Sequence, residues 1–370
     1  MTPLDGSLQP PETTSVSVGL RFALIQNMAP PRVGTSPVVV APPPLPMAPP
    51  MSADTPPPPK VVPPKVDGFD AKPVDPTEQK LDQVEKELTP TYTVKVDGTD
   101  VSADVPAAFR MNGGNNQPTP EAAQTKMTDT LQKTKQWPKD AAKQKELKQA
   151  ILQNAYGRAT PDQIKLVTDK LIAGGSLKPY LDKVKQENGG KIGPAELKTA
   201  IRRMQWDYGV GADCNGVCRV SYRQVNGKQA SAKWGDDLIP VDGKGRSENP
   251  NFKKVDVGGA KPGDVIKLDD VTGDVGHYVT VTNAKTISAA DAKKLSASPA
   301  PGGPLKQVTV LSSWGADGNP DDTTSGVNKQ TWVYDDAQKK WGTLEGNTIA
   351  WSNTDGPYEH KMVGVYRPVK

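Results

Sequence analysis

A cysteine and a histidine are the side chains of this sequence best suited to nucleophilic chemistry. Cys214 lies in the glycine-rich segment 206–218, which the sequence predicts to run into a helix, so the thiol stands at a helix N-terminus. The positive end of the helix dipole favours the thiolate, which is the nucleophilic form of cysteine. Such a nucleophile also needs a base, and the chain has two histidines, His277 and His360.

Two predicted strands carry the groups that would complete such a site. His277 opens the predicted strand 277–282, and alternation places its side chain on the face that carries valines. The same count over 307–312 places Ser312 on the valine face of that strand. If the helix that begins at Cys214 covers this face, nucleophile, base and orienting hydroxyl meet. Ser312 would then accept the Nδ1–H of His277 and leave Nε2 free for the thiol proton.

Other residues around the cysteine are candidates for support. Asp213 is expected to cap the predicted helix with its carboxylate, and backbone N–H groups at the helix entrance would bind an oxyanion. Trp206 and Trp314 are weaker candidates for a substrate groove, because aromatic residues at a domain seam are as often plain packing. Cys218 is expected to pack in the core, and His360 to lie at the surface or at an edge.

Four segments of the sequence resemble motifs of known cysteine hydrolases. Asp213-Cys214-Asn215-Gly216 resembles the Asp-Cys-Ser-Gly motif of NlpC-type peptidoglycan peptidases. Pro262-Gly263-Asp264-Val265, followed by Gly276-His277, is similar to the next two motifs of these enzymes and to those of CHAP amidases, in the same order. Ser312-Ser313-Trp314-Gly315 is similar to the Asn-Ser-Trp-Gly of papain-like enzymes, whose Asn orients the catalytic His. The resemblance covers about 206–315, and 364–367 is expected as a closing strand.

The resemblance implies a papain-like fold and the cleavage of amide bonds through a thioester, without a metal or an organic cofactor. In the cell-wall members, the substrate is the peptidoglycan stem peptide or its link to the glycan. It also implies that Gly216 and Tyr208 support the nucleophile loop. The sequence departs from the family where Asn215 stands in place of Ser, and where Ser312 stands in place of His, Asn or Gln.

Two other functions stay open at the level of the sequence. A catalytically silent papain-like module, which binds or builds part of a virion or injection apparatus, is compatible with Ser312 at the orienting position. A toxin-like protease or deamidase would direct the same cysteine chemistry at a protein. A zinc site is disfavoured, because Cys214 and Cys218 are four residues apart and both histidines lie far downstream.

The elements around these residues divide the chain into four parts. Residues 1–74 hold most of the proline runs and are predicted to be a disordered Pro-rich leader or, alternatively, a docking tail for a partner. Residues 75–117 are expected to be linker-like, with a short helix and a hairpin that turns at Asp97-Gly98. Residues 118–205 are predicted to be helical. Residues 206–370 are expected to form an α+β papain-like domain, a helix packed on an antiparallel sheet.

Charge and hydropathy argue against several kinds of partner. The net charge of +4 comes from 46 basic and 42 acidic residues, so no nucleic-acid footprint is expected. No apolar run is long enough for a membrane span or a Sec signal peptide, so we expect a cytoplasmic protein or one exported by lysis or an injection machine. Because the leader should bury little, a chain starting near Thr119 is expected to keep its stability.

Overall fold

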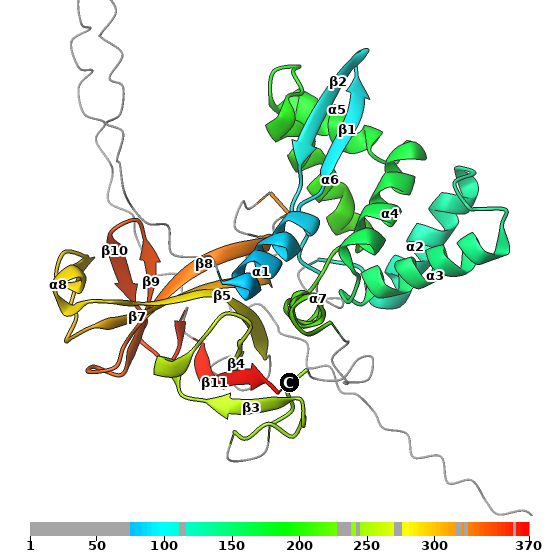
Figure 1. Ribbon diagram of the computed structural model, residues 1–370. Helices are drawn as coiled ribbons and strands as arrows, with labels where there is room; N and C mark the ends of the chain where they lie inside the picture. The colour runs from blue at the N-terminus through cyan, green and yellow to red at the C-terminus, as the bar shows by residue number, and fades with distance from the viewer. Residues whose placement is uncertain are drawn as a thin grey trace, which may run out of the picture. The chain divides into compact units, whose positions relative to one another are not determined.

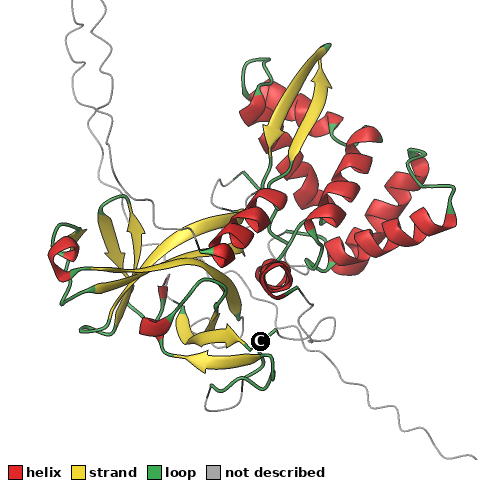
Figure 2. Ribbon diagram, viewed as in Figure 1, coloured by secondary structure: helices red, strands yellow, loops and turns green. Residues whose placement is uncertain are grey.

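The computed structural model describes most of the chain beyond the predicted leader. The described residues are 75–110, 116–227, 238–241, 245–269, 276–315, 320–321, 325–357 and 360–369. The predicted leader, 1–74, lies outside them. Within these residues the protein is α+β, with eight α-helices, a two-stranded hairpin and a nine-stranded mixed sheet (Figures 1 and 2).

The helices begin where capping residues predict them. Thr119-Pro120 and Thr160-Pro161 each place a capping hydroxyl before a proline in the sequence, which predicts a helix start. The Thr119 hydroxyl accepts a hydrogen bond from the Ala122 N–H, and Thr160 forms a capping box with Gln163, which confirms both starts. The helices are α1 (Pro76–Glu87), α2 (Pro120–Lys133), α3 (Ala141–Ala155), α4 (Pro161–Ala173), α5 (Lys178–Glu187), α6 (Pro194–Tyr208), α7 (Cys214–Asn226) and α8 (Ala289–Ala292).

The predicted hairpin is formed by β1 (Thr91–Val96) and β2 (Thr99–Asp104). Its turn residues, Asp97 and Gly98, both have positive φ, 49° and 84°, as a two-residue hairpin turn requires. The hairpin packs on α6 in the helical part of the molecule (Figure 1). The segment expected to be linker-like is therefore folded and packed.

Helices α2 to α6 share one apolar core with elements before and after them. Ile164, Val167 and Leu171 of α4 are buried in it, as their helical spacing predicts. The same cluster includes Val84 of α1 and Val217 of α7. The described residues from 75 onward accordingly belong to one compact unit.

The sheet contains the predicted strands and several that the sequence did not indicate. Its order is β3-β11-β4-β5-β7-β8-β9-β10-β6, with β10 and β6 parallel and the other neighbouring pairs antiparallel. The strands are β3 (Phe252–Val255), β4 (Val265–Asp269), β5 (His277–Ile287), β6 (Ser296–Ala297), β7 (Leu305–Trp314), β8 (Gly326–Asp335), β9 (Lys340–Glu345), β10 (Thr348–Trp351) and β11 (Lys361–Pro368). A short 3-10 helix, η1 (Val257–Gly259), separates β3 from β4. The unpredicted strands β3, β6, β9 and β10 are all short.

Helix α7 covers the sheet on the face opposite to the expected one. Cys218 and Tyr222 of α7 pack with Tyr278 of β5, which alternates with the valines of that strand. The valine face packs instead against Trp332 and Trp341. The expectation that α7 covers the valine face was wrong, because Trp341 comes from β9, a strand that the sequence pattern did not indicate.

None of the described helices is both long and apolar enough to cross a membrane.

Candidate active site

The N-terminus of α7 is fixed by the turn between α3 and α4. Asp213 is the N-cap of α7: its Oδ1 accepts the Gly216 N–H at 2.5 Å, and its Oδ2 pairs with Nη1 of Arg158. The Asp213 N–H donates to the Gly157 carbonyl at 2.9 Å. A Cβ on Gly216 would lie 2.1 Å from the same carbonyl oxygen, so only glycine fits there. The predicted cap is present, and Gly157 and Arg158 of the α3–α4 turn hold it in place.

A second segment holds the loop just before the cysteine. We call residues 107–110 the strap. The Ala108 carbonyl accepts the Ala212 N–H at 3.0 Å, and the Arg110 N–H donates to the Ala212 carbonyl at 3.1 Å. A Cβ on Gly211 would lie 2.1 Å from the Ala108 oxygen. The chain that leads into α7 is thus bonded on one side to the strap and on the other to the α3–α4 turn.

The two cysteines lie in different environments. Cys214 is half-buried at the first position of α7, whereas Cys218 is fully buried and its sulfur accepts a hydrogen bond from the Thr280 hydroxyl at 3.3 Å. Burial raises the pKa of the Cys214 thiol, and the Asp213 carboxylate raises it further, while Arg158 acts in the opposite direction. The thiol is therefore the resting form at neutral pH, because burial outweighs the effect of the helix end.

The imidazole of His277 lies against Ser312. Ser312 Oγ is 3.3 Å from Nε2 of His277, and the hydroxyl donates to the Tyr278 carbonyl at 2.6 Å. Since the single hydroxyl hydrogen is used for that carbonyl, Oγ is left to accept the Nε2–H of His277. Nδ1 is then the free nitrogen. This reverses the expected tautomer, in which Ser312 accepted from Nδ1, although the pair of residues is the same.

Two further aromatic rings surround this imidazole. The Trp314 ring lies 4.2 Å from the His277 ring, centroid to centroid, and the His360 ring is stacked at 6.1 Å. His360, expected at the surface or at an edge, is half-buried and its ring lies beside that of His277. Burial, with a smaller effect from His360, lowers the pKa of His277 to about 3. His277 is therefore neutral near pH 7 and can accept a proton.

The thiol and the imidazole lie near the same residue but are not bonded to each other. Cys214 packs against the cluster that contains Tyr278, and His277 directly precedes Tyr278 in β5. Within the described residues, no hydrogen bond joins Cys214 Sγ to His277. Hydrogen bonds between catalytic groups are often long without substrate and tighten when it binds. Along β5, however, His277 alternates with Tyr278, so the His277 side chain leaves the strand on the other face from the one that Cys214 packs against.

The remaining predicted site residues play different parts. Trp206 is only 4% exposed in α6, so it belongs to the core and does not line a groove as expected. Tyr208 ends α6, where Nζ of Lys126 lies 4.6 Å from its ring centroid. Trp314 is half-buried against His277 and is the tryptophan in contact with the candidate site.

The acidic residue of the second motif is structural. Asp264 is 1% exposed, and its carboxylate accepts two hydrogen bonds from Arg367 and one from the Lys261 N–H. These bonds tie the start of β4 to β11. Sequence reasoning missed Arg158, whose local signal is its place directly after Gly157, because glycine often ends a helix.

Potential metal ligands and cavities were compared with the positions of Cys214 and His277. Among the described residues, no group of three or more His, Cys, Asp or Glu side chains could hold a metal ion. A hollow of about 560 Å³ lies at the other end of β5. It is lined by polar and apolar side chains, among them Lys285, Ser288, Asp291, Gln307 and Leu344. Neither Cys214 nor His277 lines it.

Comparisons with protein-family models, with curated proteins and with solved structures found no match. The function must therefore be argued from the residues and their geometry. Fold and site define an α+β protein in which a half-buried cysteine opens a helix, and a histidine and a serine from neighbouring strands contact each other.

Proposed function

We propose that the protein is a papain-like cysteine hydrolase that cleaves amide bonds, with Cys214 as nucleophile and His277 as base. The observation that carries the proposal is the contact between Ser312 Oγ and His277 Nε2, covered by the Trp314 ring. These residues come from the Ser-Ser-Trp-Gly segment, which resembles the Asn-Ser-Trp-Gly of papain-like enzymes. The cysteine at the start of α7 provides the matching nucleophile.

The proposed reaction is acyl transfer in two steps. As Sγ of Cys214 attacks the substrate carbonyl, the thiol proton passes to Nδ1 of His277, and the carbonyl oxygen becomes an oxyanion. Backbone N–H groups at the start of α7, including that of Cys214, would stabilise this oxyanion. The imidazolium returns its proton to the leaving amine. Water, deprotonated by His277, then hydrolyses the thioester and restores the thiol.

The favoured substrate is peptidoglycan, cleaved in its stem peptide or at the link to the glycan. This choice rests on Asp213-Cys214-Asn215-Gly216 and Gly276-His277, which resemble motifs of cell-wall peptidases and amidases. The resemblance supports the type of reaction more strongly than the identity of the substrate, because one fold can serve many substrates.

Incubation of the full chain with purified muropeptides, followed by mass-spectrometric identification of the products, tests the proposal. We expect cleavage of an amide bond that is lost in Cys214→Ala and in His277→Ala. Cys218→Ala is the matched control, because Cys218 is fully buried four residues along the same helix and should not be needed for turnover. Cleavage retained in Cys214→Ala would contradict the assignment of the nucleophile.

The second candidate is a papain-like module that binds without catalysis. It is favoured by the raised pKa of Cys214 and by the lack, among described residues, of a thiol–imidazole hydrogen bond. Such a module would bind muropeptides equally well as the wild type and as Cys214→Ala, without turnover. A protein-directed protease or deamidase would leave muropeptides intact and would release peptides or ammonia from protein substrates.

A further inference from the structure

The side chain of Arg158 reaches the helix of the candidate nucleophile from a distant part of the chain. Arg158 lies in the turn between α3 and α4, 55 residues before its partner Asp213. The two side chains are 13% and 17% exposed, so the ion pair is largely removed from water. A pair this protected from solvent is screened far less by salt than an exposed pair.

The backbone of the same turn supports the same position. Arg158 forms an antiparallel bridge with Ala212, and Gly157 accepts the Asp213 N–H. The two residues that precede Cys214 are thus bonded to this turn. Loss of the Arg158 guanidinium would leave these backbone bonds in place, so its charge can be removed without removing the anchor.

The charges around Cys214 make the guanidinium important for the thiol. Asp213 is adjacent, and its carboxylate raises the pKa of Cys214, while Arg158 lowers it. Arg219 on α7 and Arg110 on the strap also act on Asp213 electrostatically. From β5, Tyr278 belongs to the cluster that Cys214 packs against, and His277, which precedes it in the strand, is uncharged near neutral pH. Arg158 is the cation that forms an ion pair with Asp213 in the described residues.

We propose that Arg158 is a positioning residue for Cys214, which neutralises the Asp213 carboxylate so that this N-cap holds α7 without repelling the developing thiolate. A carboxylate at a helix N-terminus stabilises the helix but disfavours a second negative charge beside it. When Arg158 pairs with this carboxylate, the cap still stabilises the helix, but its negative charge no longer disfavours the thiolate. The catalytic benefit rests on the proposed hydrolase function, whereas the effect on the thiol does not.

The test measures the rate at which iodoacetamide labels Cys214 in the full-length protein, between about pH 6 and about pH 10, with the labelled peptide identified by mass spectrometry. Arg158→Gln should slow the labelling about tenfold at a given pH, equivalent to about one unit of thiol pKa. Asp213→Asn should speed it. In the double variant Arg158→Gln/Asp213→Asn the rate should return toward that of Asp213→Asn, because no carboxylate remains to repel the thiolate.

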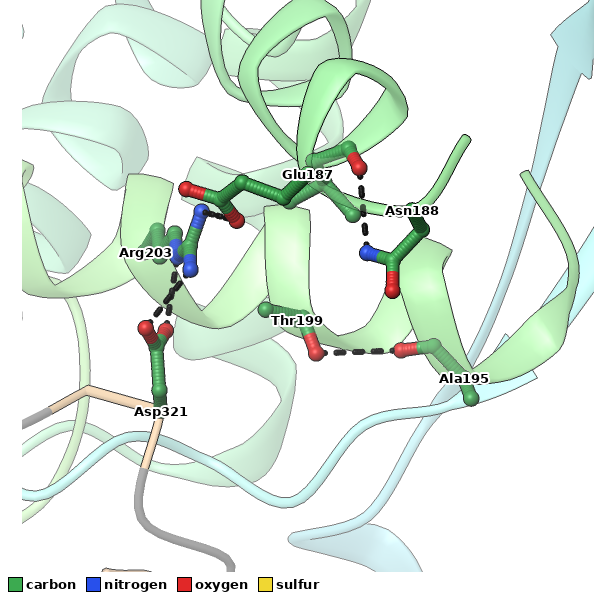
Figure 3. A network of polar contacts seen from close by, with 7 residues as sticks. Glu187, Asn188, Ala195, Thr199, Arg203 and Asp321 are labelled. Carbon is green, nitrogen blue, oxygen red and sulfur yellow. Dashed lines mark hydrogen bonds and ion pairs between the residues drawn. The ribbon is translucent and has the colours of Figure 1, made fainter. Parts of the chain in front are cut away.

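Arg203 provides a matched control within the same helical region (Figure 3). Its guanidinium donates two hydrogen bonds of 2.6 Å to Asp321 and one of 2.8 Å to Glu187, and its side chain is also 13% exposed. Arg203→Gln removes an arginine that is as buried as Arg158 but does not touch α7, and whose carboxylate partners Glu187 and Asp321 are 40% and 39% exposed. It should lower the melting temperature as Arg158→Gln does, yet leave the labelling rate of Cys214 unchanged.

Several outcomes would overturn the proposal. One is an Arg158→Gln labelling profile equal to that of Arg203→Gln, and another is slow labelling that Asp213→Asn does not restore. If Arg158→Gln fails to fold, Asp213→Asn alone tests the proposal. An unchanged labelling rate in Asp213→Asn would show that the Asp213 carboxylate does not repel the Cys214 thiolate. Labelling needs no substrate, so a protein that cleaves no muropeptide can still show the predicted shifts. That result would count against peptidoglycan as the substrate and keep the role of Arg158.

Discussion

At the scale of single residues, the Ser312 hydroxyl determines which nitrogen of His277 is left free, and so which one the proposed reaction would use. Its hydrogen is donated to the Tyr278 carbonyl, so its oxygen accepts from Nε2 of His277 and leaves Nδ1 free. A hydroxyl is a neutral acceptor and stabilises an imidazolium less than a carboxylate would. Its contribution to the barrier should therefore be modest.

Ser312→Ala should lower kcat/KM about tenfold, which corresponds to about 1.4 kcal/mol of barrier, measured with the substrate that the muropeptide screen identifies. Ser313→Ala is the matched control. Ser313 is equally buried, but its Oγ has no hydrogen-bond partner among the described residues, so the rate should not change. A loss of rate in Ser313→Ala with none in Ser312→Ala would show that Ser312 does not orient the histidine.

The lowered pKa of His277 gives a second prediction, on stability. The pKa is about 3 in the folded protein and about 6.5 in an unfolded chain, so between these values the unfolded state binds the proton and stability falls as the pH drops. From about pH 7 to about pH 5, the wild type should lose about 1 to 2 kcal/mol more unfolding free energy than His277→Gln, in urea titrations. Equal losses in both proteins would contradict a neutral, buried imidazole.

At the scale of the elements, the first turn of α7 depends on a contact between two glycines. Gly216 lies against the carbonyl of Gly157, where an added Cβ would be 2.1 Å from the oxygen. Gly216→Ala should cost about 1 to 3 kcal/mol of unfolding free energy, because α7 must shift away from the α3–α4 turn. Calorimetry or urea unfolding measures this cost.

Gly276→Ala is the control for that prediction, since Gly276 belongs to another of the glycine-containing motifs. A Cβ added at Gly276 would lie 3.7 Å from its nearest neighbouring atoms, which is ordinary contact, so the unfolding free energy should stay within about 0.5 kcal/mol of the wild type. Equal losses of unfolding free energy in the two variants would mean that the close packing of α7 on the α3–α4 turn does not restrict the side chain at Gly216.

The sequence predicted those elements whose signals are local. Capping hydroxyls at Thr119 and Thr160 and the turn at Asp97-Gly98 act over a few residues, so the helix starts and the hairpin were confirmed. The face that α7 covers depends on contacts between distant segments, and there the prediction was wrong. Likewise, nothing near Asp213 in the sequence indicates that its partner is Arg158, because the two residues meet only in the folded chain.

At the scale of the whole molecule, the segment before the helical region belongs to the same folded unit as the candidate site. Glu78 of α1 accepts a hydrogen bond from Asn283 of β5 at 2.8 Å, and Lys329 of β8 pairs with Asp82 of α1 at 2.7 Å. The strap adds a backbone bond from Val327 to Ala107. The proposed hydrolase is thus supported by elements that a minimal domain beginning at residue 206 would lack.

Truncations of the N-terminus test this integration. A chain that begins at Phe69 keeps the entire compact unit and should retain the melting temperature and the Cys214 labelling of the full protein, because the Pro-rich composition of the preceding residues favours little burial. A chain that begins at Thr119, which the sequence alone suggested would be stable, lacks several side chains that are fully or almost fully buried, five of them larger core residues. These are Leu81, Val84, Leu88, Tyr92 and Val105.

Each of these buried side chains is worth about 1.5 to 3 kcal/mol, so their joint loss approaches or exceeds the 5 to 15 kcal/mol, roughly, that stabilises a typical domain. We therefore expect the chain from Thr119 to be unfolded, or to melt far below the wild type, in circular dichroism. Both of its cysteines should then react with iodoacetamide at similar rates, because the burial that protects Cys218 is gone. If this chain instead melts with the full protein and still protects Cys218, α1, the hairpin and the strap contribute little to the fold, and the nucleophile loop does not need the strap.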